Sequence, residues 1–220
     1  MPSRRPLSQL IHFPIQAGEG GKPIVTLHDS SQFAKDVADW GPQASPDGPV
    51  TALESYKGVF VAKEIVGYTW FLGPDTAPSP MFFGDSLGEI EKFLWDEIDR
   101  SEESPAQLPF LIGIGQGGIM ALATALAVPD LLSGVIAVDA FLPKVGGWNP
   151  PLAPMNRLPI LLANPKTTGH PNALEGKTLE TQLGVWDADV ESVSVDDLKN
   201  SSVLRDWVAG HEIRYISEDE

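Results

Sequence analysis

The sequence contains no cysteine among its 220 residues. Without a thiol the chain can form no disulfide, no thiolate metal site and no cysteine nucleophile. Long apolar runs are missing too, because no stretch approaches the roughly 20 residues that cross a bilayer as a helix. Arg4 and Arg5 stand near the N-terminus, but no apolar segment follows them, which argues against a signal peptide. We therefore expect no membrane span and a cytoplasmic location.

Positive charge is scarce, since 15 Lys and Arg residues face 30 Asp and Glu residues, giving a formal net charge of -15. This charge excludes nucleic acid as the expected partner, because phosphates would be repelled. Histidines are few, and His28, His170 and His211 have no ligand partner at the i,i+4 spacing, so we expect no metal site. Nothing in the sequence indicates a cofactor either.

The length and composition predict one globular unit. Hydrophobic residues make up 42% of the chain and charged residues 20%, which is ordinary for a folded domain. A chain of 220 residues is long enough to bury a substantial core. We expect residues 1–220 to form a single domain.

Short apolar segments alternate with segments of helical periodicity. Strands are expected at 10–15, 24–27, 50–53, 110–112, 135–139, 159–163 and 190–195, and helices at 31–40, 86–98, 116–127, 174–186 and 198–207. Continuously apolar strands between helices predict an α/β fold, with a mostly parallel sheet covered on both faces. Pro14 predicts that the first strand lies at an edge, antiparallel to its neighbour. We expect the strand at 110–112 in the middle of the sheet.

Two further expectations concern the segment before residue 100. Residues 54–83 are rich in Gly, Pro and aromatic side chains, and we interpret them as a long loop packed over a site. Ser86 and Glu89 form a capping-box pattern, which predicts that the next helix begins at Ser86.

The run 109–122 is the most informative part of the chain. An apolar strand leads through Gly113-Ile-Gly-Gln-Gly117 into an Ala- and Leu-rich helix. This is the context in which the G-x-S-x-G motif of α/β-hydrolases presents a nucleophilic serine. Here the central position is Gly115, for which we expect a positive φ and a place facing a cavity. A dinucleotide-binding turn is the alternative, because Gly118 and Asp139 fit its spacing, but the position of this unit in mid-chain favours the hydrolase interpretation.

Three segments carry a resemblance to a known family. They are Leu27-His-Asp-Ser-Ser31, Gly67-Tyr-Thr-Trp-Phe71 with the following 83–91, and the run 113–122. The last is similar to the signature Gly-Phe-Ser-Gln-Gly-Gly-Ala-Met-Ala-Leu of the carboxylesterase/phospholipase (acyl-protein-thioesterase-like) branch of the α/β-hydrolases. The resemblance spans about 24–207 and implies an α/β-hydrolase fold.

The resemblance also implies roles for particular residues. Gly115 stands in place of the nucleophilic serine, and the Gln116 backbone N–H would supply half of an oxyanion hole. Relatives carry a catalytic carboxylate after the strand at 159–163, but here none follows until Glu175. An imidazole is expected after the strand at 190–195, where the chain has Asp196 and Asp197. Gly210-His-Glu-Ile213 is similar to a catalytic turn, yet it follows the terminal helix, so His211 is a candidate base outside the place where relatives carry their imidazole.

The remaining polar residues each have a structural and a functional interpretation. His28 is either a base or a structural histidine, and the hydroxyls of Ser30 and Ser31 are either displaced nucleophiles or a helix cap. Carboxylates at Asp29 and Asp139 are expected at the carboxyl edge of the sheet, where ligands bind in open α/β folds. Asp139 is alternatively a turn carboxylate whose oxygens are satisfied by backbone N–H groups. Trp70 and Gln116 complete this expected pocket, while His170 is expected in solvent.

Two functions follow from these residues. The first is an α/β-hydrolase-fold protein without conventional esterase activity, which binds a small-molecule ligand or a partner. The alternative is a hydrolase of an ester or related acyl substrate, acting through Ser30, Ser31 or an activated water, with His28 or His211 as base. A homodimer with a structural role is a third hypothesis.

Overall fold

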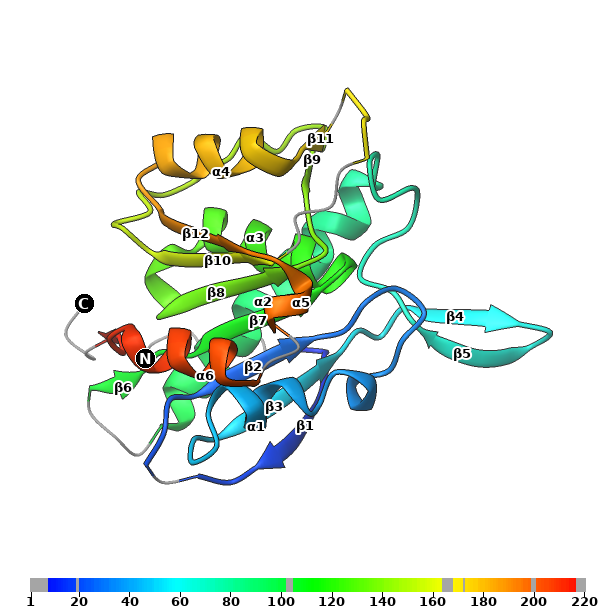
Figure 1. The fold of residues 1–220 in the computed structure, drawn as a ribbon. Helices are drawn as coiled ribbons and strands as arrows, with labels where there is room; N and C mark the ends of the chain where they lie inside the picture. The colour runs from blue at the N-terminus through cyan, green and yellow to red at the C-terminus, as the bar shows by residue number, and fades with distance from the viewer. Residues whose placement is uncertain are drawn as a thin grey trace, which may run out of the picture.

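The computed structural model describes residues 8–18, 20–101, 105–163, 168–171, 173–198 and 201–216. Its centre is a sheet in the order β1-β3-β2-β7-β8-β10-β12 (Figure 1). The strands are β1 (Ile11–Gln16), β2 (Ile24–Leu27), β3 (Val50–Glu54), β7 (Phe110–Ile114), β8 (Gly134–Val138), β10 (Pro159–Ala163) and β12 (Asp189–Val193). All neighbours pair in parallel except β1, which is antiparallel to β3 at the edge. The predicted α/β fold, the central place of β7 and the edge strand with Pro14 are confirmed.

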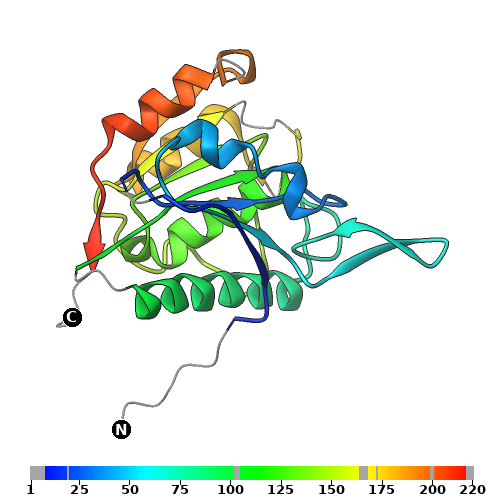
Figure 2. The same ribbon diagram turned by 90° about the horizontal axis from the view of Figure 1, so that it is seen from below.

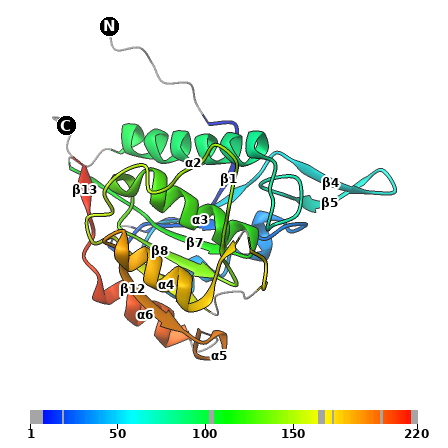
Figure 3. The same ribbon diagram turned by 90° about the horizontal axis from the view of Figure 1, so that it is seen from above.

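Helices cover both faces of this sheet, as Figures 2 and 3 show. One face carries α2 (Pro80–Arg100), α3 (Gln116–Ala127) and α4 (Gly176–Val185). The other carries α1 (Trp40–Ala44) and α6 (Ser201–Gly210), and α5 (Val195–Leu198) leads into α6. The expected helices at 116–127, 174–186 and 198–207 are therefore present, with ends shifted by a few residues.

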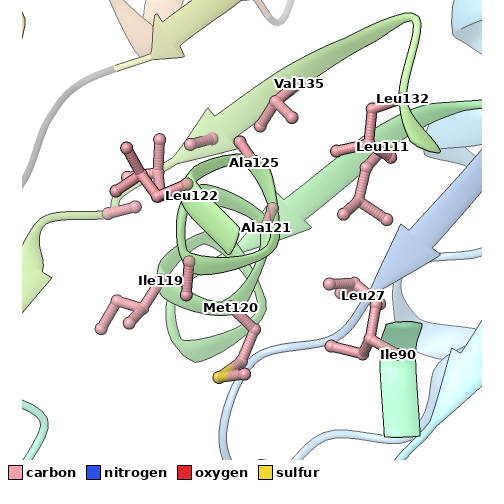
Figure 4. Packing of buried hydrophobic residues seen from close by; sticks show 14 of the residues in the cluster. Leu27, Ile90, Leu111, Ile119, Met120, Ala121, Leu122, Ala125, Leu132 and Val135 are labelled. Carbon is pink, nitrogen blue, oxygen red and sulfur yellow. The ribbon is translucent and has the colours of Figure 1, made fainter. Parts of the chain in front are cut away.

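The core forms because successive strand residues point to opposite faces. In β7, Leu111 packs toward α3, whereas Phe110 and Ile112 pack toward α6. Helix α3 is buried from Gln116 to Leu126, and Figure 4 shows the apolar side chains gathered around it. Each fully buried Leu or Ile contributes roughly 1.5–3 kcal/mol relative to exposure, so α3 is held mainly by packing.

The helix expected at 31–40 is wrong. The structure has a 3₁₀ turn at Ala34–Asp36 and then the short α1. The Asp36 carboxylate accepts the Phe33 N–H at 2.8 Å, and Asp36 N–H donates to the Phe33 carbonyl at 3.0 Å. Such local side-chain bonds compete with a continuous helix.

The expected start of the next helix at Ser86 is also wrong, because α2 begins at Pro80. Proline suits the first helical position, where its missing N–H has no helical partner to lose. Ser86 lies inside the helix, and its hydroxyl donates to the Trp70 carbonyl at 2.5 Å rather than capping.

The segment 54–83 is not a continuous loop. It contains a hairpin of β4 (Gly58–Val61) and β5 (Glu64–Tyr68), which projects from the body of the molecule in Figure 1. Ala62 and Lys63 make its turn with φ of 50° and 74°. Four other short strands pair as β6 (Ala106–Gln107) with β13 (Tyr215–Ile216) and β9 (Leu142–Pro143) with β11 (Ala173–Leu174). Across the described ranges, no helix has both the length and the apolar character needed to cross a membrane.

Candidate functional site

The carboxyl ends of β2, β7 and β8 meet at one edge of the sheet. Leu27 pairs with Gly113, and Ile114 pairs with Val138, so the segments that follow these strands lie side by side. The structure thereby brings Asp29, Gly115, Gln116 and Asp139 to the edge where open α/β sheets bind ligands. Asp139 follows β8 with a φ of 50°, and its N–H donates to the Ala163 carbonyl at 3.0 Å.

Gly115 makes the sharp turn between β7 and α3. Its φ is 54° and its ψ is -116°, which confirms the predicted positive φ. Its N–H donates to the Val138 carbonyl at 2.9 Å, and its carbonyl accepts the Ile119 N–H at 3.0 Å to begin the helix. Residues with a side chain rarely adopt this backbone conformation, so glycine suits the turn.

The space beside Gly115 is filled by the Asp29 carboxylate. An ideal Cβ at Gly115 would lie 2.1 Å from Asp29 Oδ1 and 2.4 Å from Oδ2. Asp29 Oδ1 accepts two backbone N–H groups, from Ser30 at 2.7 Å and from Gln116 at 2.8 Å. The expectation that Gly115 faces a cavity is therefore wrong on the side where its side chain would stand.

The backbone around Asp29 is fixed by Gln32 and by Tyr68, the last residue of β5. Asp29 N–H donates to Gln32 Oε1 at 3.1 Å, and Gln32 N–H donates to the Asp29 carbonyl at 3.3 Å. Ser31 N–H donates to the Tyr68 carbonyl at 2.8 Å, and Tyr68 N–H donates to the Gln32 carbonyl at 2.9 Å. The hairpin thus anchors the loop that carries Asp29, a role that the sequence did not indicate for Gln32 or Tyr68.

His28 is buried, and both of its ring nitrogens are in use. Nε2 accepts the Ser55 N–H at 3.2 Å, which leaves the proton on Nδ1, where it is donated to the Asp29 carbonyl at 2.7 Å. The ring stacks on Trp70 with the centroids 5.0 Å apart. Burial lowers the pKa of His28, so the ring is neutral at pH 7. His28 positions the Asp29 loop and has no free nitrogen to act as a general base.

His211 lies at the opposite end of the sheet. Its Nδ1 is 2.8 Å from the Trp207 carbonyl of α6, and Trp207 packs on Phe110, the first residue of β7. Gly115 follows the last residue of the same strand. At about 3.3 Å per residue, the strand separates the two ends by roughly 16 Å. The structure does not bring His211 to the carboxyl edge.

The serine candidates follow Asp29 directly in the chain, and neither His28 nor His211 is available to them as a base. Ser30 is half-buried and bound through its N–H, as above, while Ser31 is exposed and has a φ of 61°. No helix begins directly after them, so the expected cap has nothing to cap.

The segments expected to carry an acid or an imidazole have other contacts. Glu175 carboxylate oxygens accept the N–H groups of Thr168 and Gly169, and His170 N–H donates to Thr168 Oγ1 at 3.1 Å. Residues 164–167 and 172 lie outside the described residues. Asp197 is exposed and accepts a hydrogen bond from Ser194 Oγ at 2.6 Å, and the Asp196 side chain lies outside the described residues.

Gln116 and Trp70 belong to a buried polar network behind the turn. Gln116 Oε1 accepts the Thr69 hydroxyl at 2.7 Å and the Trp70 N–H at 3.1 Å, while its Nε2 donates to Asp75 at 2.9 Å. Trp70 Nε1 donates to the His28 carbonyl at 2.8 Å. This network ties the 69–75 segment to α3, and no sequence pattern pointed to Thr69 or Asp75.

Two cavities of about 340 Å³ each open elsewhere on the described surface. One lies at the amino ends of β2 and β7, beside Pro23 and Pro109. The other lies between the β9–β11 pair and the end of α4, where Trp148 and Trp186 form part of its wall. Among the described residues no group of three or more acidic or histidine side chains is placed to hold a metal ion.

Comparisons with known proteins agree with this architecture. A sequence profile of the family described as Phospholipase/Carboxylesterase matches residues 70–205. The carboxylesterase of Bacillus cereus is 14% identical with a TM-score of 0.71, covering 92% of this chain and 94% of its own. The carboxylesterase of Mesorhizobium loti is 14% identical with a TM-score of 0.68, covering 86% and 88%.

A phospholipase/carboxylesterase of Dyadobacter fermentans is also 14% identical, with a TM-score of 0.58 over 85% of this chain and 86% of its own. At such identities the solved structures show the shared fold. A search of the curated proteins finds no match.

Proposed function

Since the chain belongs to the phospholipase/carboxylesterase family and has the α/β-hydrolase fold, we propose that it is a member without serine-esterase activity that binds a small-molecule ligand or a partner. The observation that carries this proposal is Gly115. It occupies the turn between β7 and α3 with a φ of 54°, at the point where the family's signature has a serine. A glycine offers no atom that could attack an acyl carbon.

The other parts of an acyl-transfer site support the same proposal. Covalent catalysis needs a nucleophile and a base within about 2.6–3.2 Å of it. Both nitrogens of His28 are already bonded, and His211 lies at the far end of β7. A displaced nucleophile at Ser30 or Ser31 would lack an imidazole from either residue.

The cavity beside α4 supports the ligand-binding half of the proposal. Its volume of about 340 Å³ falls in the range of small-molecule sites. Its wall is largely apolar and includes Trp148 and Trp186, with Lys144 and Asn149 as polar groups. Apolar walls with a few polar groups are typical of sites for organic molecules.

The test is direct. Purified protein is incubated with p-nitrophenyl acetate, p-nitrophenyl butyrate and a fluorophosphonate probe, with heat-denatured protein as control. We expect no turnover above the control and no covalent label. Saturable turnover would contradict the proposal. So would a label mapped by mass spectrometry to Ser30 or Ser31 and lost in the corresponding Ser→Ala variant.

A further inference from the structure

The Asp29 carboxylate stands where two parts of an acyl-transfer site would stand in an active relative. Its Oδ1 lies between two converging N–H donors, one following β2 at Ser30 and the other opening α3 at Gln116. Donors that come from these two places are the pair that stabilises an oxyanion in α/β-hydrolases. The same carboxylate fills the volume of a side chain at Gly115.

We propose that Asp29 is a built-in occupant of this site, whose carboxylate takes both the place of the nucleophile and the place of the substrate oxygen. In this arrangement an acyl group cannot reach the two donors while Asp29 holds them. The inference rests on the proposed function, because it assigns that donor pair to the site whose activity is absent.

The contact is held from the backbone side. The Asp29 carbonyl accepts bonds from His28 Nδ1 at 2.7 Å and from Gln32 N–H at 3.3 Å, and its N–H binds Gln32 Oε1 at 3.1 Å. These bonds fix the main chain of Asp29. Its carboxylate therefore reaches the two donors while the loop stays in place. Charge favours the same position, since the N-terminus of α3 carries partial positive charge.

Asp29 and Gly115 are consequently coupled, although they belong to segments far apart in the chain. Any residue other than glycine at 115 would place its Cβ on the carboxylate, at 2.1 Å from Oδ1. This clash is separate from the strain of a positive φ, because that strain is present whatever stands at residue 29. A double-mutant cycle separates the two effects.

The cycle compares wild type, Gly115→Ser, Asp29→Ala and the double variant by thermal unfolding. The φ strain cancels between the two backgrounds, so the difference reports the coupling between residues 115 and 29, which includes the cost of displacing the carboxylate from its two donors. We expect Gly115→Ser to lower the Tm by about 3–10 °C more in the presence of Asp29 than in its absence. A Gly115→Ser variant that fails to fold while the double variant folds has the same meaning. Equal losses in both backgrounds would overturn the inference.

A second measurement uses acetate as a free carboxylate. In Asp29→Ala the two donors are vacated, and we expect 200 mM sodium acetate to raise its Tm by about 2–4 °C over 200 mM sodium chloride. Wild type, and Asp29→Asn, which keeps an oxygen between the donors, should respond less. An equal change in Tm for all three proteins would overturn the inference. If neither variant that carries Gly115→Ser folds, this acetate measurement alone tests the inference. Ester turnover by wild type would instead contradict the proposed function, so the two failures are distinguishable.

Discussion

Replacing His28 by alanine is the most informative single change at the site. The imidazole is buried, and its removal leaves the Ser55 N–H and the Asp29 carbonyl each without one bond, beside a gap against Trp70. Truncating a buried ring costs about 3 kcal/mol, and the Ser55 N–H that loses its partner costs about 1–3 kcal/mol more, whereas the Asp29 carbonyl keeps its bond from the Gln32 N–H. Partial relaxation of the surrounding residues offsets some of this cost, so we expect His28→Ala to lower the free energy of unfolding by about 3–5 kcal/mol at pH 7.5.

The pH dependence of this loss follows from the lowered pKa of His28. Burial keeps its pKa in the folded protein below the ordinary 6.5. Between the lowered folded value and 6.5 the unfolded chain binds a proton that the folded chain does not, so stability falls as the pH falls through 6.5. For one group the loss between pH 7.5 and 5.5 is at most about 1.4 kcal/mol. The variant has no imidazole at residue 28 and lacks this pH dependence. The difference in free energy of unfolding between wild type and His28→Ala should therefore become smaller as the pH falls.

The assay is urea unfolding followed by tryptophan fluorescence at pH 7.5, 6.5 and 5.5. His12→Ala serves as the control, because His12 is an exposed histidine on the edge strand β1. A difference in free energy of unfolding between wild type and His28→Ala that stays constant or grows as the pH falls would contradict the lowered pKa of His28. It would mean that the folded protein protonates the imidazole at least as readily as the unfolded chain does.

Three further substitutions have defined outcomes. The Gly115→Ser variant should not hydrolyse p-nitrophenyl acetate, because His28 has no free nitrogen to accept the proton of the new hydroxyl. Saturable turnover in an absorbance assay would show that another base reaches the turn. Gly88→Ala, in open space inside α2, should raise the free energy of unfolding by about 0.5–1 kcal/mol in urea titrations. Gly117→Ala should lower the free energy of unfolding by more than about 1 kcal/mol, since the new Cβ would lie 2.3 Å from the Leu27 carbonyl oxygen. Equal effects of Gly88→Ala and Gly117→Ala in the urea titrations would contradict the packing of the turn.

The parts of the fold that could be predicted are those whose signal is local. The apolar run at Phe110–Ile114, followed by glycines and a helix, predicted both the central strand and the positive φ of Gly115. Pro14 predicted the edge strand in the same way, because proline cannot donate in a ladder.

The hairpin in 54–83 was not predicted, because its turn carries an unusual pair of residues. Two-residue hairpin turns with positive φ normally contain Asn or Gly, whereas this one uses Ala62 and Lys63. The start of α2 was misplaced for a related reason, since the capping-box pattern at Ser86 was a stronger local signal than Pro80.

The central contact of the candidate site could not be predicted at all. Asp29 and Gln116 are 87 residues apart, and their bond depends on the register of β2 beside β7. The resemblance indicated both residues at one pocket, but it could not indicate that a carboxylate of this chain would lie between the donors. Such an arrangement depends on side-chain positions, which the pattern of apolar and polar residues does not encode.

The overlap between Asp29 and the side-chain position at Gly115 also constrains the order in which this sequence can change. A descendant that gains a side chain at residue 115 first would carry both the positive φ strain and the clash with the carboxylate. One that first loses the carboxylate meets only the φ strain in the second step. The accessible route toward a serine at this turn therefore begins at Asp29, a residue that is not part of the turn.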